Sequence, residues 1–126
     1  MAIVYFRDQD VIARGSWMPP VDVFETEAHD IVIKAELPGL TREEIEVTVE
    51  NSTLVLKGQK KFEAEAKEEN YRRIERSYGQ FHRSFTLPNT VDASKVSADY
   101  RNGVLTVKLP FREEAKPRTI NIDVAA

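Results

Sequence analysis

One dipeptide between two alternating runs constrains the fold of this chain more than any other feature. Asn102-Gly103 separates residues 96–101 from residues 104–109, and both runs place apolar side chains at every second position. A two-residue type I′ turn needs positive φ at both of its positions, which Asn-Gly readily supplies. The stretch therefore predicts a β-hairpin with one buried face. In this register the opposed pairs are Tyr100 with Leu105, Ala98 with Val107, and Val96 with Leu109.

Further strands are expected along the rest of the chain. A second hairpin is predicted over residues 45–58 with Asn51-Ser52 as its loop, and strands are predicted at residues 21–25, 31–37 and 79–87. Thr41 and Glu44 have the spacing of a capping box on a single helical turn. Many short strands without a long helix predict an all-β chain, an antiparallel immunoglobulin-like β-sandwich. The second hairpin pairs Val49 with Leu54, Val47 with Leu56, and Ile45 with Gly58.

Composition limits the partners that we expect. The chain has 126 residues, 41% of them apolar and 31% charged, which suits one domain with short arms. Its net charge of -3 offers no basic surface for nucleic acid. No run approaches the length of a membrane span, and residues 1–7 lack the basic start of a secretory signal. We therefore expect a cytoplasmic protein, with no nucleic-acid partner and no indication of a membrane.

The residues that usually carry catalysis or bind metals are few and scattered. There is no cysteine, and the two histidines, His29 and His82, are far apart in sequence and not in metal-ligand spacing. No Gly-x-Ser-x-Gly motif is present, and residues 57–60 lack the two bracketing glycines of a phosphate-binding loop. The sequence predicts neither an enzyme nor a cofactor or metal site.

Apolar residues also occur outside the predicted strands. Residues 1–19 read as an N-terminal arm, which either packs on its own domain or contacts other subunits and unfolded chains. Residues 111–118 form a polar tether, followed by an extended segment that docks on an exposed groove or sheet edge, or back on its own domain. The apolar arm residues are Ile3, Val4, Tyr5, Phe6, Val11, Ile12 and Trp17, and those of the tail are Ile120, Ile122 and Val124.

Two features in the middle of the chain are unusual. Residues 59–70 are highly charged and contain one large apolar residue, Phe62, so they are read as a solvated loop leading into a strand at residues 71–76. A strand carried on such a loop can reach outside its own domain. Arg83 shares a strand face with Phe81 and Phe85. Either its stem packs and its guanidinium reaches the rim, or it forms an ion pair at a subunit interface.

The residues from Ala98 to Pro110, Ala-x-x-x-Asn-Gly-Val-Leu-Thr-Val-x-Leu-Pro, resemble the signature of the α-crystallin-type domain of small heat-shock proteins. The resemblance runs from about Pro20 to Pro110 and resumes at Ile120-x-Ile122. It divides the chain into an arm (1–19), a domain (20–110) and a C-terminal extension (111–126). The match is to a bacterial-type member of the family.

This resemblance implies an ATP-independent holdase that suppresses aggregation of partly unfolded proteins as a reversible homo-oligomer of strand-exchanged dimers. The alternative is a monomeric co-chaperone or adaptor module on a related sandwich. The resemblance also implies that Arg83 lies at an interface and that Ile120 and Ile122 fill a groove on a neighbouring subunit. The groove residues would be Ile45, Val47, Val49, Val96, Ala98 and Tyr100, and those of the dimer loop and exchanged strand Phe62, Tyr71, Arg72, Arg73 and Ile74.

Overall fold

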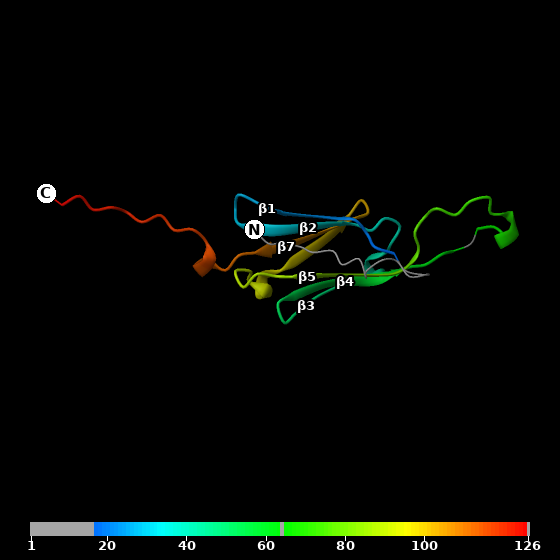
Figure 1. Cartoon of the computed structure of the whole chain (residues 1–126), viewed down its shortest axis with the longest axis horizontal. Helices are drawn as coiled ribbons and strands as arrows, with labels where there is room; N and C mark the ends of the chain where they lie inside the picture. The colour runs from blue at the N-terminus through cyan, green and yellow to red at the C-terminus, as the bar shows by residue number, and fades with distance from the viewer. Residues whose placement is uncertain (1–16, 64, 126) are drawn as a thin grey trace.

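Two antiparallel sheets stack face to face in the computed structural model, which describes residues 17–63 and 65–125 (Figure 1). The predicted all-β sandwich is confirmed. The first sheet has the order β1 (Val21–Glu25), β2 (Asp30–Glu36), β7 (Val104–Pro110) and β6 (Ser97–Arg101). The second has the order β3 (Ile45–Glu50), β4 (Thr53–Lys60) and β5 (Gly79–Thr86). Single 3₁₀ turns occur at Arg42–Glu44, Glu68–Asn70, Ala93–Lys95 and Glu113–Ala115.

Both predicted hairpins form in the predicted register. Asn102 and Gly103 have φ values of 54° and 77°, and Asn51 and Ser52 have 51° and 60°, as type I′ turns require. The first turn pairs Tyr100 with Leu105, and the second pairs Val49 with Leu54. Asn-Ser therefore adopts the same kind of turn as Asn-Gly, because the alternating pattern of its flanking strands imposes the register.

The core lies between the two sheets and is built from the inward side of each strand. Alternate residues of β2, β4, β5 and β7 face inward, and their apolar side chains interdigitate. Burial of this face is the main term that stabilises the sandwich. The buried apolar strand residues of this core are Ile31, Ile33, Ala35, Leu54, Leu56, Phe81, Phe85, Leu105, Val107 and Leu109.

The turn before β3 has the predicted capping geometry. The backbone N–H of Thr41 donates to Glu44 Oε1 at 2.8 Å, and the Thr41 hydroxyl donates to the same oxygen at 3.0 Å. These two hydrogen bonds lower the pKa of the Glu44 carboxyl. The turn leads the chain from Leu40, which is buried, into β3 on the other sheet.

Packing of the described chain extends beyond the predicted domain at both ends. Trp17 was expected among the contact residues of the arm, but it is 8% exposed and belongs to the core. Its backbone N–H donates to the Gln80 carbonyl at 2.9 Å, and its indole Nε1 donates to the Gly79 carbonyl at 3.1 Å. Phe111, expected in the tether, forms a β-bridge with Val91 and packs against the core.

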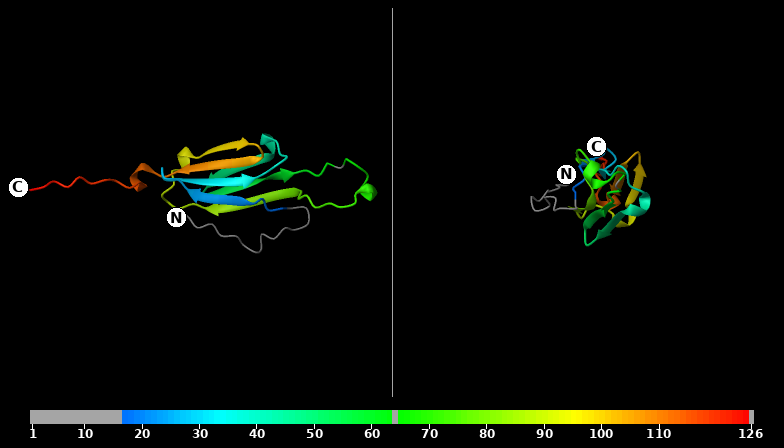
Figure 2. Two further views of the ribbon diagram at one scale, coloured as in Figure 1. Left: turned by 90° about the horizontal axis from the view of Figure 1, so that it is seen from above. Right: turned by 90° about the vertical axis from the view of Figure 1, so that its right-hand side faces the viewer.

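The connection between β4 and β5 differs from its prediction in two ways. β4 continues to Lys60, so Gln59 and Lys60 belong to the strand, paired with Gln80 and Gly79. Residues 71–76 form no strand within the described chain. The connection extends away from the sandwich, as the green segment in Figures 1 and 2 shows, so no sheet edge lies beside it. A strand needs a partner for its backbone groups.

Candidate functional site

An open groove runs between the edge strands β3 and β6. It has a volume of about 400 Å³ and is lined by Arg42, Ile45, Val47, Ala98, Asp99, Tyr100 and Leu105. A four-stranded sheet faces a three-stranded one here, and β6 and β3 are both edges. The predicted apolar face of β6 is therefore only partly covered: Ala98 is exposed and Tyr100 is half-buried.

Tyr100 is held in place by its hydroxyl. Its O–H group lies within hydrogen-bonding distance of the Leu37 carbonyl and, at 3.2 Å, of the Leu40 carbonyl. Both acceptors belong to the segment that crosses between the two sheets. The phenol ring is therefore a fixed part of the groove wall, and the apolar surface beside it does not depend on a mobile side chain.

The structure brings four of the six predicted groove residues together around this hollow: Ile45, Val47, Ala98 and Tyr100. The other two, Val49 and Val96, are half-buried and pack against the core nearby. Arg42, Asp99 and Leu105 also line the groove and were not predicted to do so. Leu105 follows from its pairing with Tyr100, whereas Arg42 enters from the 3₁₀ turn, which no strand pattern in the sequence places there.

The tail is extended and fully accessible. Ile120, Ile122 and Val124 are 83%, 88% and 92% exposed. The red segment in Figure 1 runs away from the sandwich, at the end opposite to the β4–β5 connection. Within the described residues the tail does not dock back on its own domain.

The β4–β5 connection, residues 61–78, carries an aromatic cluster. The Phe62 ring lies 4.8 Å from that of Tyr78 and 5.7 Å from that of Tyr71, measured between centroids. The backbone N–H of Glu65 donates to the Tyr71 hydroxyl at 3.0 Å. Ile74 is 53% exposed and offers apolar surface beyond this cluster. Of the predicted dimer residues, Phe62 and Tyr71 are thus in contact, while Arg72, Arg73 and Ile74 are solvent-exposed.

Lys60 occupies the base of this connection. Its side chain is buried, and its Nζ lies 5.3 Å from the centroid of the Trp17 ring and 5.9 Å from that of Tyr78. Burial lowers the pKa of the Lys60 ammonium, and the nearby positive charge of Arg76 lowers it further. No sequence pattern marks this cluster, because the pairing of β4 with β5 brings residue 60 beside residue 79, and hydrogen bonds to Gly79 and Gln80 bring Trp17 there.

Arg83 is buried rather than placed at the rim. Its side chain is 5% exposed, its Nη1 donates to the Pro19 carbonyl at 2.7 Å, and its guanidinium carbon lies 5.5 Å from the Phe85 ring centroid. The packing interpretation was therefore right about the stem and wrong about an exposed guanidinium. The interface role of Arg83 stays a prediction.

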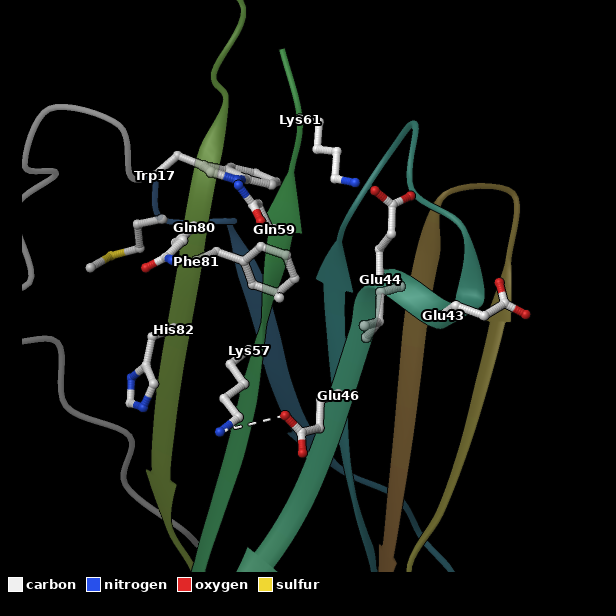
Figure 3. Close-up of a pocket in the computed structure, with 13 residues that line it drawn as sticks. Trp17, Glu43, Glu44, Glu46, Lys57, Gln59, Lys61, Gln80, Phe81 and His82 are labelled. Atoms are coloured by element: carbon white, nitrogen blue, oxygen red, sulfur yellow. Dashed lines mark ion pairs between the residues drawn. The ribbon is translucent and has the colours of Figure 1, made fainter. Parts of the chain in front are cut away.

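A larger hollow of about 740 Å³ lies at the end of the β3–β4–β5 sheet (Figure 3). Trp17, Phe81 and Ile45 form its apolar part, but charged and amide side chains dominate its rim. Lys57 Nζ pairs with Glu46 Oε2 at 3.5 Å across the two strands, as the dashed line in the figure marks. The groove between β3 and β6 has fewer charged side chains in its lining, Arg42 and Asp99.

The described residues contain neither a cluster of metal-ligating side chains nor a helix that could span a membrane. Within residues 17–63 and 65–125, no group of three or more His, Cys, Asp and Glu side chains could hold a metal ion. The same residues contain no helix long and apolar enough to cross a membrane. Of the predicted arm contacts, Ile3, Val4, Tyr5, Phe6, Val11 and Ile12 lie outside the described residues.

Comparisons with known proteins agree on one family. The sequence model of the Hsp20/alpha crystallin family matches residues 23–124. Small heat shock protein C4 of Rickettsia felis is 36% identical over 104 residues, which are 82% of this chain and 63% of that protein. The chain therefore spans slightly less than two thirds of the length of this relative.

Solved structures give the same result for the fold. A small heat-shock protein from Xylella fastidiosa superposes with a TM-score of 0.72 at 39% identity, covering 86% of this chain and 98% of that one. Heat shock protein 16.0 from Schizosaccharomyces pombe superposes with a TM-score of 0.74 at 31% identity, covering 95% and 94%. The sandwich is shared over nearly all of both structures.

Proposed function

The chain belongs to the Hsp20/alpha crystallin family, and on that premise we propose that it is an ATP-independent holdase. Members of the family are small heat shock chaperones, which are generally not enzymes. In the proposed function the chain binds partly unfolded proteins and suppresses their aggregation. It works as a reversible homo-oligomer built from dimers.

One observation carries the proposal: the described chain exposes an apolar tail and an apolar groove that do not meet. Ile120 and Ile122 are 83% and 88% exposed, and the groove between β3 and β6 has a volume of about 400 Å³. Exposed apolar surfaces of this kind mark interaction sites in soluble proteins. The tail of one subunit is proposed to lie in the groove of a neighbour.

The geometry of the tail favours contact with a neighbour over contact with its own groove. Phe111 is tied to the domain by its bridge to Val91, and its N–H donates to the His29 carbonyl at 3.2 Å. From this anchor the tail runs away from the sandwich (Figure 2). Each tail contact is weak alone, but many linked contacts hold an assembly together while exchanging with clients.

The proposed dimer uses the β4–β5 connection. Residues 72–76 have exposed side chains, and residues 71–76 have no strand partner in the described chain, so they can pair with a sheet edge of a second copy. Within the described chain the terminal strands of the two sheets are β1, β3, β5 and β6, and the β5 edge is bonded at Gln80 by the Trp17 N–H. The crystal structure of the Xylella fastidiosa relative, described as a distinct high order structure, supports assembly as a property of such chains.

A client-aggregation assay tests the function. The full chain is mixed with a heat-unfolded client without nucleotide, and turbidity is followed beside the molar mass from light scattering. We expect protection without ATP, from a species larger than a dimer. Protection that appears only with ATP contradicts the holdase mechanism, and a strict monomer without protection favours the adaptor alternative.

A further inference from the structure

Lys60 is a buried cation whose neighbours are aromatic rings. Its side chain is 8% exposed, and a buried ammonium is costly unless other groups stabilise its charge. None of the ion pairs formed within residues 17–63 and 65–125 involves Lys60. Its Nζ lies 5.3 Å from the Trp17 ring centroid and 5.9 Å from that of Tyr78, within the range of cation–π attraction.

These two rings belong to different parts of the molecule. Trp17 is part of the core and is fixed by its hydrogen bonds to the carbonyls of Gly79 and Gln80. Tyr78 is the last residue of the β4–β5 connection, directly before Gly79, the strand partner of Lys60. The ammonium therefore joins the sandwich to the connection at the point where the connection begins and ends.

Tyr78 in turn organises the rest of the connection. Its ring packs edge-on against Phe62 at 4.8 Å, and Phe62 contacts Tyr71 at 5.7 Å. The Arg76 guanidinium carbon lies 5.4 Å from the same Tyr78 ring. Phe62, Tyr71, Arg76 and Tyr78 thus form one series of contacts within the connection, and Lys60 links this series to Trp17.

We propose that Lys60 is a positioning residue for the association of two copies of this chain. Its ammonium, held between Trp17 and Tyr78, fixes the direction in which residues 61–78 leave the sandwich. A segment already held in its bound direction loses less conformational entropy on association, so the dimer is tighter. The inference rests on the proposed dimer, in which this connection pairs with a second copy.

Matched variants separate charge from shape. Lys60→Met keeps an unbranched apolar side chain and removes the charge, whereas Lys60→Arg keeps a cation. Tyr78→Leu and Tyr78→Phe form a second pair, in which the ring is lost or kept. Lys57→Met is the control, because Lys57 lies on the same strand with a side chain 52% exposed and pairs with Glu46.

Each variant is made in the full chain with Ile120→Ala and Ile122→Ala, which should limit assembly to dimers, and this doubly substituted chain is the parent; sedimentation velocity over a dilution series then measures the dimer dissociation constant. For Lys60→Met and Tyr78→Leu we expect an increase of about tenfold, equivalent to about 1.4 kcal/mol. Lys60→Arg, Tyr78→Phe and Lys57→Met should stay within about threefold of the parent chain, a free-energy change under about 0.7 kcal/mol. The melting midpoint of Lys60→Met should not fall, since methionine is buried without a charge to desolvate. A merely structural role would lower it.

Fluorescence reports directly on the cluster, because Trp17 is the only tryptophan. Its emission should change in Lys60→Met and keep the parent spectrum in Lys60→Arg. A parent-like dissociation constant in both Lys60→Met and Tyr78→Leu overturns the inference. So does an equal weakening by Lys60→Arg and Lys60→Met, since the charge would then be irrelevant.

A further variant, in which Asn-Gly replaces residues 61–78, distinguishes a failure of the proposed dimer from a failure of the role of Lys60. If this variant remains dimeric, the proposed dimer itself is wrong. If it is monomeric while Lys60→Met and Tyr78→Leu associate like the parent chain, only the role of Lys60 is wrong.

Discussion

Strand β7 and the tail carry the same alternation of apolar side chains in different surroundings. In β7, Leu105, Val107 and Leu109 are 3%, 0% and 0% exposed. In the tail, Ile120 and Ile122 are 83% and 88% exposed. β7 has β2 and β6 as hydrogen-bonded neighbours and a second sheet across the core. Within the described chain the tail has neither.

The difference separates what an alternating pattern specifies from what it leaves to the surroundings. Period-two alternation favours an extended backbone with one apolar face. It does not supply the surface against which that face is buried. In β7 the same chain supplies this surface, and burial stabilises the domain. In the tail the surface is proposed to come from a neighbour, so burial would stabilise the assembly.

The largest expected effect on the domain comes from truncating the buried face of β7. Leu109 is 0% exposed, and Leu109→Ala removes its packing and leaves a cavity, at a cost of about 2–5 kcal/mol in the free energy of unfolding. The matched change in the tail, Ile122→Ala, should alter this free energy by less than about 0.5 kcal/mol. Denaturant unfolding monitored by circular dichroism measures both, and equal costs would abolish the distinction between the two segments.

A smaller effect is expected at the turn that begins β7. Gly103 has a φ of 77°, and a Cβ there would lie 3.3 Å from Pro38 Cα. Gly103→Val should cost about 1–3 kcal/mol, because a β-branched residue resists positive φ. Gly103→Asn is the control: it adds a Cβ as well, but asparagine tolerates this conformation. If both variants lose the same stability, crowding against Pro38 explains the cost rather than φ.

Local signals made most of the sandwich predictable. The pairing of Asn102-Gly103 with alternating runs determined the β6–β7 register, and the same logic succeeded for Asn51-Ser52. Both turns join strands that are adjacent in sequence. The alternating pattern and the turn residues therefore favour the same strand register, and contacts with distant residues are not needed to specify it.

What could not be predicted depends on contacts between distant residues. Trp17 was assigned to the arm because no periodicity marks it as core, and its place follows from hydrogen bonds to residues more than 60 positions away. The cluster of Lys60 with Trp17 and Tyr78 is invisible in the sequence for the same reason. The expected strand at residues 71–76 had a suitable composition, but a strand also requires an edge, which one chain does not provide there.

The β4–β5 connection should affect association more than stability. Lys60 and Gly79 are directly opposed, as are Arg101 and Val104, so Asn-Gly can replace residues 61–78 as a two-residue turn. The shorter loop costs less entropy to close, which favours folding, whereas loss of the ring contacts opposes it. The net change in the free energy of unfolding should stay below about 1 kcal/mol. Far-UV circular dichroism should show that the variant is folded. At concentrations low enough for the tail contacts to dissociate, light scattering should give the mass of a monomer. An unchanged dimer mass would rule out pairing through this connection.

The smallest effect on the domain, with a large effect on the assembly, is expected from Ile120→Ala combined with Ile122→Ala. Burying an isoleucine contributes about 1.5–3 kcal/mol, so each docked tail gains roughly 3–6 kcal/mol before the cost of ordering it. Ordering the tether and side chains removes part of this gain, which leaves each contact reversible. Because linked tails act together, losing both isoleucines should reduce the assembly towards dimers.

The melting transition of the domain should not move, since both side chains are already exposed in the single chain. Client protection should rise or hold, because the vacated groove presents its apolar surface to unfolded chains. Gel filtration with light scattering decides the matter: an unaltered oligomer would show that the tail is not the link, and residues 1–16 would become the next segment to delete.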